Sequence, residues 1–520
     1  TTLQLNEQSL SVQVCNLQDG EMRSLYKTLN MDLRQYKKLQ MYIHAEAVGA
    51  ATALKDGQVE AVIRIGSDFV SNYYEYRIPL KITDWNGPKT SADIWPERNN
   101  LDLLMSQLST LKQQRNMCDS CSPLLPYPQV PVADQYGNYM SVVGNPSLGD
   151  ARTMMIGIQN PKDDGQPRCA EVWLDELRLS DFDEKGGYAA LARVDMQLSD
   201  LGTISVSGNM HTAGFGNIDQ RVNERFRDNF MQYDAAANLD LGKLLPKKAG
   251  ISIPVYAGYS QSVSNPEYDP YDLDIKLKDK IALARSRREK DSIRRDAQDF
   301  TSIKSLNFTN VRKLNLGAGG KRHLWDIENF DISYSFSQIL RHNPLIQNDV
   351  LTKHRGGIGY NYAGQPHYLE PFKKLINSKT HWLDLIRDFN INYVPAILSF
   401  RADVSRQFGA TRVRNVGGDV KYQLPETYNK YFTFDRYYTV KWDLTRSINF
   451  EFNAVNNARI DEPNGRIDDA AKKDTVRRNF FKGGRNTNYM HNANFTYTLP
   501  TSKFPALSWT NIAFGYSTEY

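Results

Sequence analysis

The sequence predicts an all-β chain in which a soluble β-sandwich-like domain with one helix precedes a transmembrane antiparallel β-barrel segment, with about twelve strands of a larger barrel. Three observations lead to this fold class. Apolar and polar residues alternate over many short runs, which is typical of strands buried on one face. The later runs are separated by turns and long loops. Aromatic residues make up 11% of the 520 residues, although the mean hydropathy is only −0.56.

Composition and charge exclude several classes of protein. The longest apolar run, Tyr393 to Phe400, is under half the roughly 18 to 20 residues of a spanning helix, which excludes a helical membrane protein. The 29 Tyr and 22 Phe argue against disorder, because such a chain can bury enough surface to fold. The 64 basic and 59 acidic residues are too evenly balanced for a nucleic-acid partner. The opening TTLQLNEQ contains no targeting segment, so we expect a mature product or an internal fragment.

Residues 1–187 are predicted to form the soluble domain. Runs such as VEAVIRIG and YEYRIPLKIT alternate with period two, as expected for sandwich strands. A helix is predicted near 100–113, where Asn100 can cap it and leucines recur at helical spacing. Sandwiches of this shape often bind sugars, so Trp85, Trp95 and Trp173 could form a stacking platform. The other interpretation is that they belong to the core.

All four cysteines lie in the first third of the chain, at Cys15, Cys118, Cys121 and Cys169. Cys118 and Cys121 form a CxxC that has neither a second ligand pair for zinc nor the strand–helix context of a redox motif. The sequence therefore favours a disulfide between them in an oxidising compartment. Metal binding, redox chemistry and free thiols remain as alternatives.

Residues 188–520 are predicted to supply the barrel strands, and two of these define the faces most clearly. In FDISYSFS and SINFEFNA, bulky apolar residues alternate strictly with polar ones. The residues predicted to face lipid are Phe330, Ile332, Tyr334, Phe336, Ile448, Phe450 and Phe452. The residues predicted to face the lumen are Asp331, Ser333, Ser335, Asn449, Glu451 and Asn453. One cation, Arg436, falls on the predicted lipid face, so either it snorkels or that part of the face contacts protein.

The spacing of the predicted strands favours a barrel over a soluble sandwich. The strands are predicted to begin near residues 189, 203, 230, 249, 305, 326, 350, 389, 431, 447, 488 and 507. Short connections are expected after the odd-numbered strands and long ones after the even-numbered strands, as in bacterial outer-membrane barrels. One exception is a helix predicted within 363–388 on the short side. Pro395 is expected to require a bulge in the eighth strand.

The sequence contains few candidate residues for catalysis or ligand binding. No catalytic residue, metal site or cofactor is predicted, because no nucleophile, base or ligand cluster has the required spacing. IDEPNGRIDD (460–469) resembles a calcium loop faintly, but an acidic outer loop is the simpler interpretation. The charged stretch 278–299 is predicted to be a solvated helix in a long loop, with a docking surface as the alternative. We therefore expect the chain not to be an enzyme.

Several long strings resemble the SprA (Sov) family of the type IX secretion system. They are EVWLDELRLSDFDEKGGYAALARVDMQLSDLG (171–202), NPEYDPYDLDIKL (265–277), KSLNFTNVRK (304–313), HRGGIGYNY (354–362), NYVPAILSFRADVSRQF (392–408), WDLTRSINFEFNAVNNARIDEPNG (442–465) and FPALSWTNIAFGYS (504–517). The resemblance is dense over 170–520 and looser before it. These proteins are several times longer than this chain, so the resemblance implies an internal fragment.

The resemblance implies a translocon for protein secretion and gliding motility in the cell outer membrane, a large barrel that passes folded cargo proteins with C-terminal signals out of the periplasm. It also implies three kinds of contact: a PorV-like barrel shuttle protein, a periplasmic plug protein and membrane lipid. Two other functions are compatible with alternating strands. One is a passive porin or nutrient-uptake barrel, and the other is a soluble carbohydrate-binding β-protein.

Overall fold

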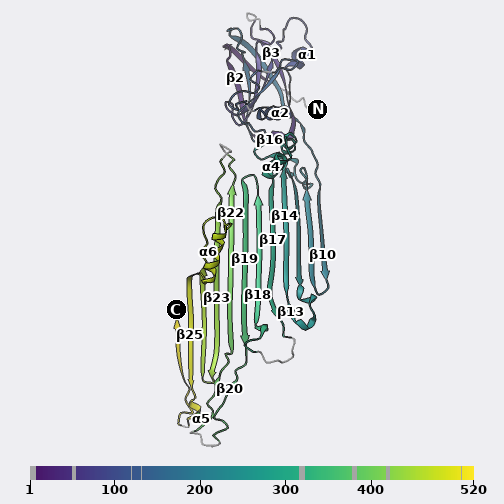
Figure 1. Ribbon diagram of the computed structural model, residues 1–520. Coiled ribbons are helices and arrows are strands. Elements are labelled where there is room, and N and C mark those ends of the chain that lie inside the picture. The colour runs from purple at the N-terminus through teal and green to yellow at the C-terminus, as the bar shows by residue number, and fades with distance from the viewer. Residues whose placement is uncertain are drawn as a thin grey trace. The chain divides into compact units, whose positions relative to one another are not determined.

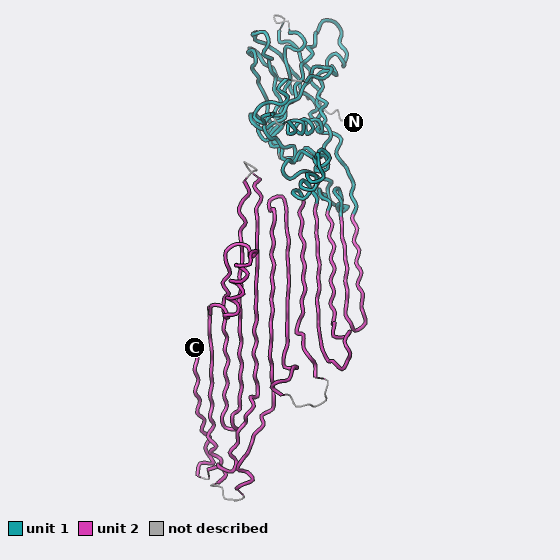
Figure 2. Tube along the Cα trace, viewed as in Figure 1, with its two compact units in different colours: residues 1–188, 211–229, 265–297 teal, residues 189–210, 230–264, 298–520 magenta. Residues whose placement is uncertain are grey.

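The computed structural model describes residues 8–49, 54–118, 120–130, 132–315, 323–376, 383–416, 422–504 and 506–520. The described chain is mostly β-strand, with few helices (Figure 1). It divides into two compact units (Figure 2). Unit 1 contains 1–188, 211–229 and 265–297, and unit 2 contains 189–210, 230–264 and 298–520. Among these residues, none of the helices is both long and apolar enough to cross a bilayer.

Unit 1 is built on two antiparallel sheets with the strand orders β1-β9-β3-β6 and β2-β8-β4-β5-β7. The strands are β1 (Leu10–Leu17), β2 (Met22–Met31), β3 (Tyr36–Ala47), β4 (Glu60–Gly66), β5 (Tyr73–Pro79), β6 (Leu101–Leu104), β7 (Tyr139–Val143), β8 (Ala151–Gln159) and β9 (Arg168–Phe182). Alternate residues of both sheets, among them Ile43, Ile63 and Val172, form one buried core. The two sheets therefore enclose one shared core, in the manner of a sandwich.

The helices of unit 1 differ from the prediction of a single helix near 100–113. Residues 101–104 form β6, which pairs with β3 and buries Leu101 and Leu103 on one side. Helix α2 (Met105–Asn116) begins only after this strand. The alternation of Leu101 and Leu103 suits a strand at the edge of a sheet. Pairing with β3 satisfies backbone N–H and C=O groups that would otherwise bond within a helix. Unit 1 also contains α1 (Ser91–Ile94), α3 (Leu277–Leu283) and α4 (Arg287–Ala297), so the charged stretch 278–299 is mainly two helices.

The three tryptophans converge on His44, which is fully buried in β3. The ring centroids of Trp85, Trp95 and Trp173 lie 5.9, 6.0 and 4.3 Å from the imidazole. The planes of Trp95 and Trp173 meet at 60°, an edge-to-face packing typical of a domain core. Sugar-binding platforms instead present a flat face, so this arrangement argues against a platform. The three rings are not part of the buried core either, because Trp85 is 50% exposed and Trp95 and Trp173 are only partly buried.

Unit 2 is dominated by one long antiparallel sheet of thirteen strands. In spatial order its main path is β10-β11-β12-β14-β17-β18-β19-β22-β23-β24-β25-β26, with β13 beside β17. The strands are β10 (Ala189–Leu198), β11 (Gly202–His211), β12 (Asp228–Asp240), β13 (Ile251–Ser252), β14 (Pro254–Pro266), β17 (Asp299–Lys313), β18 (Phe330–His342), β19 (Ile346–Ala363), β22 (Ile397–Val413), β23 (Thr427–Thr445), β24 (Ile448–Arg459), β25 (Arg485–Leu499) and β26 (Ile512–Glu519).

The predicted strand starts follow the observed ones closely, with the largest difference at the strand expected near 389. That strand, β22, begins at Ile397, because residues 391–392 form β21 and pair with β20 (Tyr368–Leu369). Pro395 therefore lies outside the sheet, and the expected bulge is wrong. Of the helix predicted within 363–388, the structure describes α5 (Asp384–Arg387), whereas 377–382 lie outside the described residues.

The connections do not alternate as strictly as predicted. A tight turn at 343–345 joins β18 to β19 on the side where long loops were expected. The connections 212–227, 267–298 and 460–484 are long, as predicted, and they hold most of the remaining short elements. These are β15 (Tyr268–Asp269), β16 (Asp272–Lys276), α3, α4 and α6 (Ala470–Phe481).

The long sheet is open within the described chain. β10 and β26 stand at its two ends, and each has one neighbour there. The backbone groups on the outer side of these strands are thus available for pairing. A closed barrel is not formed by these strands alone.

Candidate functional site

The strand register places all seven residues predicted to face lipid on one face of the long sheet. Residues directly opposite each other in antiparallel strands point to the same side. One such row runs through Phe330, Tyr360, Phe400, Tyr438 and Ala454. The other predicted residues of β18 and β24 share this side because they alternate with it along each strand. We call it the apolar face.

The apolar face carries large side chains that other described residues leave uncovered. Phe330 is 44% exposed and Ile332 is 53% exposed, and Phe514, on the same face at the far end of the sheet, is 59% exposed. Soluble monomers rarely leave so extended an apolar surface open to water. The surface therefore indicates contact with lipid or with another protein surface.

The opposite side, which we call the polar face, carries the six residues predicted to face the lumen. One of its rows runs through Ser333, Gly357, Asp403, Asp435 and Asn457. Side chains bridge neighbouring strands there. The Asn457 amide donates to the Asp435 carboxylate at 2.7 Å. Such a face suits water far better than hydrocarbon.

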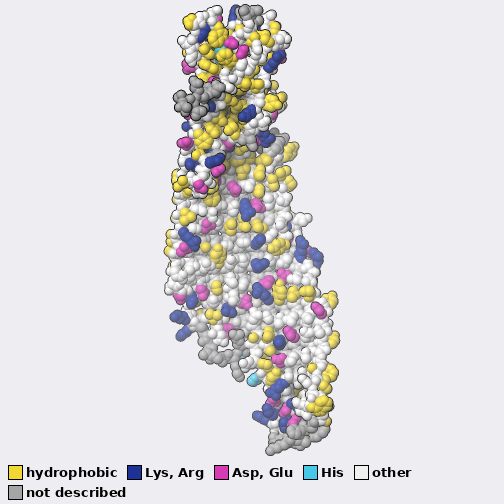
Figure 3. Space-filling model, turned by 180° about the vertical axis from the view of Figure 1, so that it is seen from behind, with side chains coloured by type: hydrophobic (Ala, Val, Ile, Leu, Met, Phe, Trp, Pro, Cys, Tyr) yellow, Lys and Arg dark blue, Asp and Glu magenta, His cyan; other side chains and the backbone are white. Residues whose placement is uncertain are grey.

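Figure 3 views the molecule from behind, on the side away from α6, which overlies the sheet in Figure 1. Because α6 packs on the apolar face, the view from behind shows the polar face of unit 2. There, acidic and basic side chains are scattered over the surface, with hydrophobic groups between them. The sheet thus separates two chemically different surfaces, as the alternation in the sequence predicts.

The connection 460–484 covers part of the apolar face, and its Gly483 lies beside the Arg436 guanidinium. The Arg436 guanidinium lies over the Phe434 ring at 4.9 Å and donates to the side chains of Asn456 and Asn486 at 3.1 Å. Asn486 lies just after this connection, at the start of β25. Of the two expected outcomes, contact with the chain itself is the one observed.

Two further cations of the apolar face are also satisfied by this connection. Arg406 pairs with Glu462 at 2.7 Å, and the Lys430 ammonium donates to the backbone carbonyls of Pro463 and Gly465 at 2.6 and 2.8 Å. The carboxylates of 460–469 therefore bind neighbouring cations. Asp461, for example, pairs with Arg485 at 3.4 Å. This favours the acidic-loop interpretation over a calcium loop.

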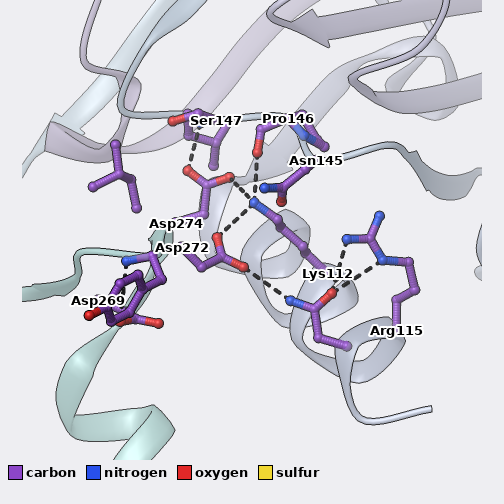
Figure 4. Close-up of polar contacts among 12 residues, drawn as sticks. Lys112, Arg115, Asn145, Pro146, Ser147, Asp269, Asp272 and Asp274 are labelled. Atoms are coloured by element: carbon purple, nitrogen blue, oxygen red, sulfur yellow. Dashed lines mark hydrogen bonds and ion pairs between the residues drawn. The ribbon is translucent and has the colours of Figure 1, made fainter. Parts of the chain in front are cut away.

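A buried polar cluster in unit 1 was not predicted from the sequence (Figure 4). Lys112 of α2 is 1% exposed, and its ammonium donates to Asp272 at 2.7 Å, to Asp274 at 3.4 Å and to the Pro146 carbonyl at 2.7 Å. The Tyr74 hydroxyl donates to Asp274 at 2.6 Å. The segment that contains β16 is thus bound to both α2 and β5.

Burial has the largest effect on the pKa values of Asp274 and Tyr74 in this cluster. Desolvation raises the pKa of Asp274, and the Lys112 charge opposes that rise. Desolvation also raises the pKa of Tyr74 well above its usual value, and the Asp274 charge adds to the effect. Each group therefore depends on its partner, since a buried charge without one is costly. The cluster fixes the 265–297 segment within unit 1.

We expect Tyr74→Phe to loosen the 265–297 segment. Removing a hydrogen bond to a charged group costs about 1.5–3 kcal/mol, because Asp274 would keep its burial but lose a donor. Hydrogen exchange of α3 and α4 in the full-length protein measures the change. Tyr73→Phe is the matched control, because the ring that Arg64 contacts at 4.3 Å remains. Equal exchange in both variants would show that the hydroxyl does not hold the segment.

The cysteines form two disulfides in the structure. Cys118 is bonded to Cys121, and Cys15 in β1 is bonded to Cys169 in β9, a pair that the sequence analysis did not join. No spacing rule could have found the second pair, because its members are far apart in the chain and meet only through β1–β9 pairing.

Thiol labelling of the unreduced, denatured protein is therefore expected to modify none of the four cysteines. After reduction, all four should react. Labelling of Cys118 and Cys121 without reduction would contradict the disulfide, and stoichiometric zinc would instead support the metal alternative.

Together these features define a class: a β-rich protein that combines a sandwich-like unit with an open sheet of one apolar and one polar face. Residues 1–281 match the sequence model of the SprA_N family, described as motility related/secretion protein. The chain belongs to this family. No curated protein matches it. The matched residues extend from the sandwich strands through β14 and into α3, so the match includes the first strands of the long sheet.

Proposed function

We propose that this chain is an internal part of a protein-conducting channel in the cell outer membrane, belonging to the type IX secretion system. In this role the sheet forms a sector of the barrel wall. The apolar face contacts lipid, and the polar face lines a wet lumen through which folded cargo passes from periplasm to cell surface. The proposed role includes no chemical step.

One observation carries the proposal. Over nine neighbouring strands, from β14 to β26, the register places most aromatic and aliphatic residues on one side and most Ser, Asn and acidic residues on the other, with Arg406, Lys430 and Arg436 among the exceptions on the apolar face. A wall between hydrocarbon and water requires this separation. The two open edges support a sector of a wider barrel, because a membrane strand cannot leave its backbone groups unpaired in lipid. The secretion family supports the transport of protein rather than of small solutes.

The proposed partners follow the same logic. Secreted proteins with C-terminal signals would pass along the polar face, and a PorV-like barrel shuttle protein and a periplasmic plug protein would bind elsewhere on the full-length protein. Membrane lipid would surround the apolar face.

Site-specific cross-linking tests the proposal in the full-length protein in cells. A photoreactive residue at Ser333 should cross-link to secreted cargo, because that position lies on the polar face. The same residue at Ile332, one position away, should cross-link to lipid and not to cargo. Cargo adducts at Ile332 alone would invert the assignment of the faces. If the probe at Ser333 cross-links to no cargo protein during active secretion, the result would favour a passive porin.

A further inference from the structure

A polar pocket of about 320 Å³ lies in unit 1, between edge strands of its two sheets. One wall comes from β3, from β6 and from the residues just before β6. The other wall comes from β5 and from the loop 134–138, which leads into β7. Nearly all of the lining side chains are charged groups, amides or tyrosines. This composition differs from that of the buried core beside it, and no structural role described above accounts for it.

The loop 134–138 is fixed by its own hydrogen bonds. The Asp134 carboxylate accepts from the backbone amides of Tyr136 at 2.8 Å and of Asn138 at 2.9 Å. The Asn138 carbonyl accepts from the Asp134 amide at 2.8 Å. Gly137 has a φ of +86°, a left-handed conformation that glycine adopts without strain. The loop therefore holds Tyr136 and Asn138 in place before any ligand arrives, which lowers the entropy cost of binding.

The charges of the pocket nearly balance. The charged side chains that line it are the carboxylates of Glu97, Asp102 and Asp134 and the guanidiniums of Arg98 and Arg178. Arg178 already pairs with Glu176 at 2.7 Å. Among the described residues, the carboxylates here do not converge closely enough to hold a metal ion. Charge therefore selects neither an anion nor a metal cation as the occupant.

Three of the lining side chains bury a polar atom that has no hydrogen-bond partner within the described chain. These atoms are Arg98 Nε, Asn100 Oδ1 and Asn138 Oδ1, one donor and two acceptors. Tyr76 is 9% exposed, and burial raises the pKa of its hydroxyl, to which the Asp134 charge adds. The hydroxyl therefore keeps its proton and can both donate and accept. A mixture of donors and acceptors around one pocket suits a ligand rich in hydroxyl groups.

Two tyrosine rings give the pocket an aromatic surface. Tyr42 is 37% exposed and Tyr136 is 39% exposed. The Arg178 guanidinium lies over the Tyr42 ring at 5.9 Å, whereas the described residues place neither a ring nor a cation on Tyr136. Aromatic rings pack against the C–H faces of sugar rings, and planar amides, carboxylates and guanidiniums bond to the hydroxyls around them. The free ring of Tyr136 beside such groups points to a saccharide.

We propose that this pocket binds a short neutral saccharide. The sugar ring stacks on Tyr136, the Arg98 guanidinium donates to its hydroxyls, and the amide oxygens of Asn100 and Asn138 accept from them. The volume lies at the lower end of the range of roughly 300–1,000 Å³ that small-molecule sites span, which suits a short ligand. The site is distinct from the tryptophan cluster around His44. It goes beyond the proposed channel, because every residue in it belongs to unit 1.

Saturation-transfer NMR of the full-length protein in lipid nanodiscs tests the proposal. The probes are the neutral trisaccharides maltotriose, mannotriose and chitotriose, and the ring protons of at least one should receive saturation. Tyr136→Ala should weaken that binding by about tenfold, because the stacking surface is removed. Arg98→Gln should weaken it by a similar factor, because a charged donor is lost. Tyr136→Phe keeps the ring and should retain most of the binding.

Tyr26→Ala is the matched control, because Tyr26 is a 72% exposed tyrosine of unit 1 on β2, outside the pocket. It should leave the saturation transfer unchanged. An equal loss with Tyr26→Ala would show that the effect is not specific to the pocket and would overturn the site. Absence of transfer to all three trisaccharides, or transfer that Tyr136→Ala leaves intact, would also overturn it. Tighter binding of glucose 6-phosphate than of glucose would show recognition of an anion through Arg98, in place of a neutral sugar.

Discussion

Arginine in place of Ile332 is expected to block assembly of the full-length protein into the membrane. Ile332 is half exposed on the apolar face, in the row that contains Ile358 and Ala402. A charged side chain facing lipid costs about 2–4 kcal/mol at the bilayer midplane, because it cannot be hydrated there. The amount of protein that is protected from protease in outer-membrane fractions measures the effect.

Ser333→Arg is the matched control, one residue away on the polar face. Its opposite neighbour is Gly357, which leaves room for a long side chain, and the next residue in the row is Asp403, which can pair with it. We expect near-normal assembly. Loss of assembly with Ser333→Arg and not with Ile332→Arg would mean that the assignment of the two faces is reversed. Normal assembly of both variants would argue against lipid contact at this strand.

The faces of the long sheet could be predicted from the sequence because their signal is local. In FDISYSFS every second residue is bulky and apolar, and a strand with period two must place these on one side. The same reasoning failed for 101–104, where Leu101, Leu103 and Leu104 fit a helix as well as a strand. Only pairing with β3, about sixty residues away, decides between them.

Features that depend on distant segments could not be predicted. Lys112 and Asp274 are separated by 162 residues, and neither stands in a pattern that marks a buried ion pair. The packing of Phe480 on Phe432 and Phe434 was similarly hidden, because Phe480 sits in a charged connection between two strands. Arg436 on the predicted lipid face was the one useful signal. It indicated that either this side chain snorkels or that part of the face contacts protein.

The segment 188–520, expressed alone, is expected not to form a stable barrel. Its strands reach from β10 to β26 without closing, so two rows of backbone amides and carbonyls would face hydrocarbon. Each unpaired group costs several kcal/mol in lipid, and the total far exceeds the stability of an ordinary domain. The segment would also lose β1 to β9, and with them Tyr74 and Lys112, which hold 265–297 in unit 1.

Heat-modifiable mobility in detergent gels and single-channel recording provide the measurement. We expect aggregation, no shift between heated and unheated samples and no conductance. The full-length protein, treated in the same way, should give a heat-dependent shift if the proposed larger barrel completes the pairing of both edges. A stable, heat-modifiable and ion-conducting barrel formed by 188–520 alone would mean that β10 pairs with β26. The sheet would then be a small pore, too narrow for folded cargo, and the passive porin would replace the translocon as the function of this chain.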